Sequence, residues 1–421
     1  MKTIYPGERG ILVQYMQLAL TRAGYVTDIS GLFDESTCLI LNAFLRREMS
    51  CVVDDAVWEQ LLPYLKGYLT HTVSAGDTFY MLARRYRTKE SLIMAANPQV
   101  VPENIPIGST LTIPLDFSLV SSRVPYTSWL NELVIEGLCA RYPFLSSSCI
   151  GKSVIGRSIM QLRIGRGEKQ IFYNGSFHAN ESITTPLLLK FAEDYGRAYA
   201  TGGTIDGVDV QQLYRDYCLM MVPMVNPDGV DLVNGYLTEG YYYEQAETIA
   251  ARYPQIPFPS GWKANIDGVD LNLQFPAGWE LAKEIKFAQG YTTPAPRDYV
   301  GEAPLSAPES RTVYEFTLHN DFRLILAYHT QGEVIYWKYQ DYEPERSKQI
   351  ADYFSYVSGY AVEETPSASG NAGYKDWFIL SYNRPGYTIE AGEGVNPLPM
   401  NMLDAIYEVN RGILLGGMLE I

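Results

Sequence analysis

The chain lacks several features that would assign it to a familiar class. None of its 421 residues lies in a run near the roughly 18 to 20 uninterrupted apolar residues that a membrane span needs. The segment Met1–Gln14 also lacks the apolar stretch of a secretory signal peptide. We therefore expect no membrane partner, and a protein that stays in the cytoplasm unless lysis or an unusual route releases it.

Cysteine and histidine are also scarce. The five cysteines are odd in number and form no CxxC pair, so we expect buried free thiols rather than a disulfide framework. A formal net charge of -15 argues against nucleic acid as a partner, because the phosphates would be repelled. Any metal site must draw on four histidines, which are His71, His178, His319 and His329.

Apolar residues make up 47% of the chain, enough for a large hydrophobic core. Its length suits two or three domains. Residues 1–66 predict three short helices, with Ser36 or Thr37 as the cap of the second. The order of Gly24-Tyr25, Gly31-Leu32-Phe33, Thr37, Phe44 and Trp58 resembles the three-helix peptidoglycan-binding domain. An arbitrary helical bundle is the alternative.

Residues 69–116 predict two strands that flank two helices. The first strand is expected at His71-Thr72-Val73, a turn at Gly76-Asp77-Thr78, and the return strand at Leu111-Thr112-Ile113-Pro114, preceded by Asn97-Pro98. This βααβ order, with its turn and its Asn-Pro in register, resembles the LysM domain. The resemblance implies a glycan partner containing N-acetylglucosamine. An unrelated small α+β linker domain is the alternative.

Residues 123–421 alternate apolar runs with helical patterns, which is typical of an α/β domain. We expect a mixed, doubly wound sheet with strands at residues 170–177, 217–225, 323–328 and 386–389, and a helix over 184–200. The Tyr- and Pro-rich residues 241–259 are expected to form a surface excursion. The Ser/Ala/Gly stretch 366–373 is expected to form a lid loop.

Candidate metal ligands stand at the ends of the predicted strands. His178-Ala179-Asn180-Glu181 follows the first strand, His329 ends the third, and Glu390 ends the fourth. Open α/β sheets place their sites at the carboxyl ends of strands, and zinc takes three N or O ligands with one position open. A His-x-x-Glu motif on its own more often lies on a protein surface without binding a metal. His319 lacks any partner pattern and is expected to be structural. His71 belongs to the first strand of the βααβ unit and is expected to be non-catalytic.

The order of motifs over the whole domain is more specific. His178-x-x-Glu181, Asn226-Pro227-Asp228-Gly229, Gly268-Val269-Asp270-Leu271-Asn272, His329 and Thr388-Ile389-Glu390 resemble the zinc metallocarboxypeptidase family. The resemblance implies one zinc per chain on His178, Glu181 and His329, with Glu390 as general base. It also implies that Asp270 orients His178. Trp262-Lys263 falls where the family has Trp-Arg, so Lys263 is the candidate cation for the oxyanion.

Two departures from the family bear on the substrate. Family carboxypeptidases follow this asparagine with an arginine, and the pair binds a terminal carboxylate, but Asn272 is followed by Leu273. An endopeptidase is thereby favoured. Asp376-Trp377 precede Glu390 at the family's spacing, which places Lys375 on the floor of the specificity pocket. Asn272, Tyr374 and Lys375 are therefore the substrate-binding candidates, and Lys375 would suit a carboxylate such as that of diaminopimelate. A solvated loop lysine is the alternative.

Together, these features resemble the γ-D-glutamyl-L-diamino acid endopeptidases of sporulating Gram-positive bacteria. The resemblance implies hydrolysis of peptidoglycan stem peptides, at the γ-D-glutamyl-diaminopimelate bond, and association with the spore or cell wall after release. Two other readings stay open: an inactive wall-binding or spore structural protein, and a zinc carboxypeptidase on ordinary peptides. Intact zinc ligands count against the first of these, and Leu273 counts against the second.

Overall fold

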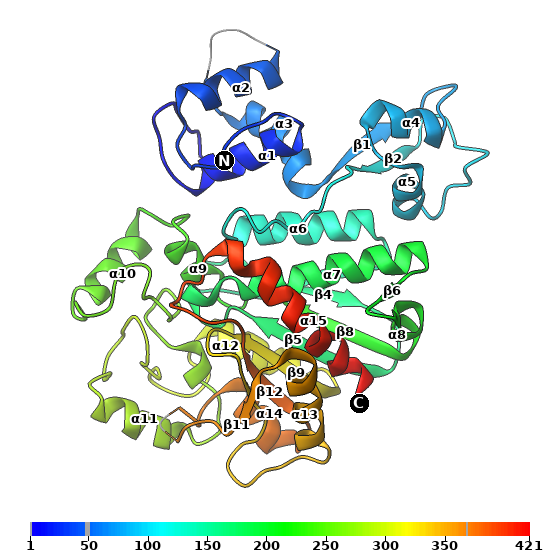
Figure 1. Cartoon of the computed structure of the whole chain (residues 1–421). Coiled ribbons are helices and arrows are strands. Elements are labelled where there is room, and N and C mark those ends of the chain that lie inside the picture. Colours follow the sequence, from blue (N-terminus) through cyan, green and yellow to red (C-terminus); the bar gives the residue numbers. More distant parts are fainter. Residues whose placement is uncertain (1, 47–50, 368) are drawn as a thin grey trace.

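The computed structural model describes residues 2–46, 51–367 and 369–421. In it a helical unit and a small βααβ unit lie over α6 (Ser128–Arg141) of a larger α/β domain (Figure 1). The predicted fold class is confirmed. Within the described ranges, no helix has both the length and the apolar character needed to cross a bilayer.

The helical unit contains α1 (Ile11–Arg22), α2 (Glu35–Leu45) and α3 (Asp55–Lys66). The prediction of the second cap was wrong by two or three residues. The Asp34 side chain accepts a hydrogen bond from the Thr37 backbone N–H at 2.8 Å, because a cap acts from just before the first helical turn.

The expectation of buried free thiols was wrong for most of the cysteines. Cys38 and Cys51 form a disulfide, with Cα atoms 5.3 Å apart. Their separation of 13 residues in the sequence does not reveal this pairing. Of the three free cysteines, only Cys218 is buried, while Cys139 is half-buried and Cys149 exposed.

The helical unit packs directly on the α/β domain. The Tyr15 hydroxyl donates to the Pro125 carbonyl at 2.8 Å, and the Trp58 ring meets the Trp129 ring edge-on at 5.8 Å. Both contacts belong to one apolar cluster that continues from α1 and α3 into α6. Burial of this shared apolar surface stabilises the junction as it does a domain interior.

The βααβ unit consists of β1 (Tyr68–Thr72), α4 (Phe79–Tyr86), α5 (Glu90–Ala96) and β2 (Thr110–Pro114). Its strands are antiparallel, so Tyr68 and Pro114 lie opposite each other. The Arg141 guanidinium donates to the carbonyls of Gly67 and Leu115, at 3.1 and 3.0 Å. One side chain of the α/β domain therefore holds both ends of the excursion.

The α/β domain is built on an eight-stranded sheet in the order β11-β10-β12-β9-β5-β8-β4-β3. The four central strands, β12, β9, β5 and β8, are parallel, and β10 and β4 run antiparallel to them on either side. The strands are β3 (Ser146–Lys152), β4 (Ser158–Ile164), β5 (Lys169–Gly175), β8 (Tyr217–Val222), β9 (Phe322–His329), β10 (Val334–Tyr336), β11 (Ala361–Glu363) and β12 (Gly386–Glu390).

Helices cover both faces of this sheet. On one face lie α6, α7 (Thr184–Thr201), α13 (Ser347–Ser358) and α15 (Leu403–Leu419), and on the other α12 (Pro308–Leu318) and α14 (Tyr374–Tyr382). Successive residues of β9 alternate between the two apolar clusters: Leu324 and Leu326 join the first, Ile325 and Ala327 the second. Burial on both faces explains why the strand is a continuous apolar run.

The remaining elements are short or lie outside the sheet. They are β6 (Thr204–Ile205), β7 (Val208–Asp209), α8 (Val210–Asp216), α9 (Pro227–Val233), α10 (Tyr241–Ala250), α11 (Trp279–Ala288) and the 3₁₀ turns Ala179–Glu181, Leu271–Leu273 and Met400–Met402. The predicted excursion at 241–259 thus begins with a helix. Ala246, Ile249 and Ala250 are buried at helical spacing, a pattern that the tyrosines and prolines around them concealed.

Candidate metal centre

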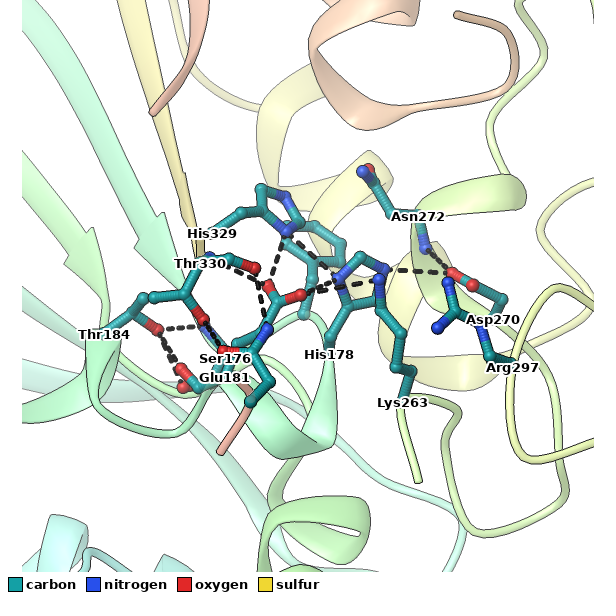
Figure 2. A network of polar contacts seen from close by, with 12 residues as sticks. Ser176, His178, Glu181, Thr184, Lys263, Asp270, Asn272, Arg297, His329 and Thr330 are labelled. Carbon is teal, nitrogen blue, oxygen red and sulfur yellow. Dashed lines mark hydrogen bonds and ion pairs between the residues drawn. The ribbon is translucent and has the colours of Figure 1, made fainter. Parts of the chain in front are cut away.

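Three residues converge at the carboxyl edge of the central strands. His178 follows β5, the 3₁₀ turn Ala179–Glu181 turns the chain so that Glu181 faces it, and His329 is the last residue of β9. His178 Nδ1 lies 2.9 Å from Glu181 Oε1, and His329 Nδ1 lies 2.9 Å from Glu181 Oε2. Figure 2 shows both imidazoles turned toward this carboxylate. One ligand atom from each residue fits within 4.8 Å of the others.

The donor set suits a zinc ion. The Nδ1 atoms of His178 and His329 are 3.2 Å apart, so two buried imidazole nitrogens meet beside one carboxylate. Two nitrogens and an oxygen, with a cleft on the open side, form the ligand set of a catalytic zinc site. The other two histidines lie elsewhere. His319 is exposed and donates to the Glu315 carbonyl, and His71 contacts Tyr86 and Asp77 in the βααβ unit.

Asp270 holds His178 from the far side of the ring. Its Oδ1 lies 3.2 Å from His178 Nε2, and its two oxygens also accept the backbone N–H groups of Asn272 and Asp298. A proton kept on Nε2 leaves Nδ1 free as the ligand atom. Burial alone would lower the pKa of His178, but the carboxylates of Glu181 and Asp270 raise it to about 9. A metal must therefore displace a proton from this site at neutral pH.

Glu390 stands next to the three candidate ligands. It ends β12 opposite His329 in the neighbouring strand and lines the same cleft. Burial raises the pKa of its carboxyl, and the Glu181 carboxylate adds to this, while His329 and Lys263 act in the opposite direction. A carboxylate with a raised pKa is suited to accept a proton and return it.

Lys263 brings a positive charge to the same place. Its backbone carbonyl accepts the N–H of Ala179 at 3.0 Å, and its Nζ lies 3.5 Å from Glu181 Oε1. Burial lowers the pKa of the ammonium, but Glu181 and Asp270 outweigh this and raise it. The predicted oxyanion cation therefore lies beside the candidate ligands and is charged.

A cleft of about 750 Å³ opens over the site and contains two of the three predicted substrate-binding residues, Asn272 and Lys375. The Lys375 ammonium is already bonded, to the Lys338 carbonyl at 2.8 Å and Thr365 Oγ1 at 2.9 Å, with Asp376 Oδ1 also at 2.9 Å. Its charge is thus balanced within the protein. In the predicted lid, Ser369 and Gly373 line the cleft, and Ala368 lies outside the described residues.

The third, Tyr374, does not contact the cleft, and this prediction was wrong. Its side chain is fully buried, its hydroxyl bonds to Thr317 Oγ1 at 2.9 Å, and its ring stacks on Phe177. Lys375 and Asp376, in the first turn of α14, line the cleft. Because Tyr374 lies on another side of the same turn, its side chain points into the core.

Arg297, which the sequence did not indicate, also lines the cleft. It belongs to no recognisable motif, and it follows Pro296, whose carbonyl accepts the backbone N–H groups of Lys263 and Ala264 at 2.8 and 2.9 Å. This contact between two loops, together with the hydrogen bond from the Asp298 backbone N–H to Asp270, brings Arg297 to the site. The sequence signal was limited to a basic-acidic pair, Arg297-Asp298, in a loop.

Comparison with known proteins agrees with this architecture. Residues 132–411 match the family of zinc carboxypeptidases, and residues 71–114 match the LysM domain. The chain is 47% identical over 294 residues to gamma-D-glutamyl-L-diamino acid endopeptidase 1 of Lysinibacillus sphaericus, covering 70% of this chain and 72% of the relative. It is 40% identical to the uncharacterized protein YqgT of Bacillus subtilis, over 71% of this chain and 79% of the relative.

Solved structures agree at the level of the fold. Carboxypeptidase A from Helicoverpa armigera superposes with a TM-score of 0.54 at 18% identity, covering 80% of each chain. The thrombin-activatable fibrinolysis inhibitor superposes with a TM-score of 0.56 at 15% identity, covering 84% of this chain and 98% of the other. The resemblances stated from the sequence to the zinc peptidase family and to LysM are therefore confirmed.

Proposed function

We propose that this chain, which belongs to the zinc carboxypeptidase family and is a zinc metallopeptidase, hydrolyses the γ-D-glutamyl-diamino acid bond of peptidoglycan stem peptides. The main support is a relative, 47% identical, whose name states that specificity. The absence of an arginine after Asn272 adds to it, because Leu273 cannot form the charge-assisted contact with a terminal carboxylate.

Each residue of the centre has a role in this proposal. His178, Glu181 and His329 hold zinc, which when bound polarises the scissile carbonyl and acidifies water. Glu390 accepts the proton of the attacking water and returns it to the departing amine. Lys263 stabilises the negative charge that develops on the carbonyl oxygen.

The N-terminal units would bring this chemistry to its polymer. The LysM domain supports binding to N-acetylglucosamine chains, and residues 1–66 are proposed to bind peptidoglycan as a second module. Both units are fixed on the peptidase domain, so a bound glycan strand would be held in a defined position relative to the cleft. A place at the cell wall, and a role in sporulation, follow from the same proposal.

The direct test is mass analysis of purified muropeptides after incubation with the protein. We expect products that differ by cleavage between D-glutamate and the diamino acid, and no products after the metal is removed with a chelator, because the remaining groups lack the Lewis acid. Activity should return when zinc is added back. Cleavage only at the C-terminal residue would instead support the carboxypeptidase reading.

Removal of the LysM domain should separate binding from catalysis. Because Tyr68 and Pro114 are opposed in neighbouring strands, a short Gly/Ser linker can replace residues 69–113 without displacing the ends. We expect less of this variant than of wild type to sediment with insoluble peptidoglycan, and we expect it to retain most of its kcat/KM on a short soluble peptide. Unchanged sedimentation would show that the LysM domain contributes nothing to wall binding.

A further inference from the structure

A cluster of charged side chains forms one wall of the cleft beside the metal centre. Asp298 lies between two cations: its Oδ1 is 2.6 Å from Lys286 Nζ, and its Oδ2 accepts from Arg297 Nε at 2.6 Å. One carboxylate therefore pairs with two positive charges. All three residues line the cleft.

Arg297 is the accessible end of this cluster. Its side chain is 43% exposed, whereas Lys286 and Asp298 are 10% and 13% exposed. Its Nε donates to Asp298, but Nη1 and Nη2 donate to no residue that the structure describes. Those two nitrogens are the paired donors with which a guanidinium binds a carboxylate.

Its place is fixed next to the reacting groups. Asp270, which orients His178, also accepts the backbone N–H of Asp298 at 3.2 Å. The neighbouring Pro296 carbonyl is bonded to the backbone of Lys263, the candidate oxyanion cation. Figure 2 shows the Arg297 guanidinium beside the carboxylate of Asp270. Burial lowers the pKa of Arg297, but the carboxylates of Asp298 and Asp270 outweigh this and raise it.

The other cations of the cleft are already engaged. The Lys375 ammonium has three partners within the protein, the Lys263 ammonium is paired with Glu181, and Lys286 is paired with Asp298. Arg297 is the one arginine among the lysines and arginines that line the described part of the cleft, and its paired Nη1 and Nη2 nitrogens donate to no residue that the structure describes.

We propose that Arg297 binds a carboxylate of the substrate close to the scissile bond. A γ-linked glutamyl residue keeps its α-carboxylate free a few bonds from the carbonyl that is attacked, and the diamino acid on the other side can carry a free carboxylate too. The contact replaces, from a different loop, the arginine missing at Leu273. The inference rests on the proposed function, since it names what this substrate offers to the cleft.

The test compares three peptides: γ-D-glutamyl-diaminopimelate, the same peptide with the glutamyl α-carboxylate amidated, and the same peptide with the diaminopimelate carboxylates amidated. For Arg297→Ala we expect a roughly 10- to 100-fold loss of kcat/KM on the first peptide, because a charge-assisted hydrogen bond is lost. On the amidated peptide that lacks the carboxylate bound by Arg297, Arg297→Ala should lower kcat/KM only slightly. The position of the amide in that peptide identifies which carboxylate Arg297 binds.

Matched variants separate specificity from structure. Arg297→Lys keeps the positive charge but loses the paired Nη1 and Nη2 donors. Compared with Arg297→Ala, it should recover only part of the preference for the unamidated peptide. Arg311→Ala removes an exposed arginine that does not line the cleft, and should leave all three rates unchanged. Equal losses on the three peptides, with zinc retained, would overturn the proposal, as would a preference that is lost in Lys375→Ala but kept in Arg297→Ala.

A binding measurement distinguishes failure of this inference from failure of the proposed function. If zinc-loaded wild type cleaves none of the three peptides, the proposed function fails. Calorimetric binding of the acid peptide to Glu390→Gln and to Glu390→Gln/Arg297→Ala tests the contact without turnover. We expect the double variant to bind at least tenfold more weakly, and equal affinity would overturn the role of Arg297.

Discussion

Replacing Glu390 by glutamine is expected to lower kcat by about 10²- to 10⁴-fold while zinc content and fold stay unchanged. The amide has nearly the same shape but cannot accept the proton of the attacking water. Glu390 lies opposite His329 in the adjacent strand, so the variant keeps the candidate ligands in place. The measurement is kcat on a γ-D-glutamyl-diamino acid peptide, with zinc content measured on the same preparation.

Glu393→Gln is the matched control. Glu393 lies three residues further along, is exposed and does not line the cleft, so its neutralisation should change kcat little. KM should also change little in Glu390→Gln if the residue acts on the water rather than on the bound peptide. Turnover close to that of wild type, with zinc at full occupancy, would remove Glu390 from the proposed chemistry.

The sheet could be predicted because its strands carry a strong local signal. Central parallel strands are buried on both faces, so β8 and most of β9 appear as continuous apolar runs, and β5 has a shorter one at Ile171–Tyr173. The same reasoning failed at residues 241–259. There the buried side of α10 consists of Ala246, Ile249 and Ala250, which is too short an apolar pattern to stand out beside the exposed Tyr241.

The candidate site could be predicted as far as motifs reach. His178, Glu181, Asp270, His329 and Glu390 each stand at a strand end or in a short turn that follows the family's order, and the structure brings them together. Arg297 and Tyr374 depend instead on tertiary packing. The contact of Pro296 with Lys263 brings Arg297 to the cleft. The first turn of α14 directs Tyr374 into the core.

Domain organisation shows the same limit. Segment composition predicts three modules along the chain, but does not predict that Trp58 packs on Trp129 in a core shared with the peptidase domain. Nor does it predict that Arg141 holds both ends of the βααβ unit. Such contacts join residues more than 25 positions apart, so no pattern within a short stretch of sequence predicts them. Fragments cut at the predicted boundaries would therefore expose apolar surface.

Replacing His329 or His178 by alanine is expected to reduce bound zinc from about one ion per chain to a small fraction of one, and activity to background. Each histidine supplies one of the three ligand atoms that lie within 4.8 Å of one another in the described part of the chain. Loss of one leaves a two-ligand site in which the Glu181 carboxylate keeps a single imidazole partner. The measurement is zinc content by elemental analysis after dialysis, together with kcat on the soluble peptide.

The control is His319→Ala, which removes an exposed histidine whose ring donates to the Glu315 carbonyl, and it should leave zinc and activity intact. Asp270→Asn is the informative intermediate. It keeps the three ligand atoms but weakens the contact that fixes His178, so zinc should bind with roughly 10- to 100-fold lower affinity rather than be lost. Full zinc in His329→Ala would contradict the ligand assignment. Full zinc in both histidine variants would mean that the ion is held elsewhere, and the convergence of β5 and β9 would then need another explanation.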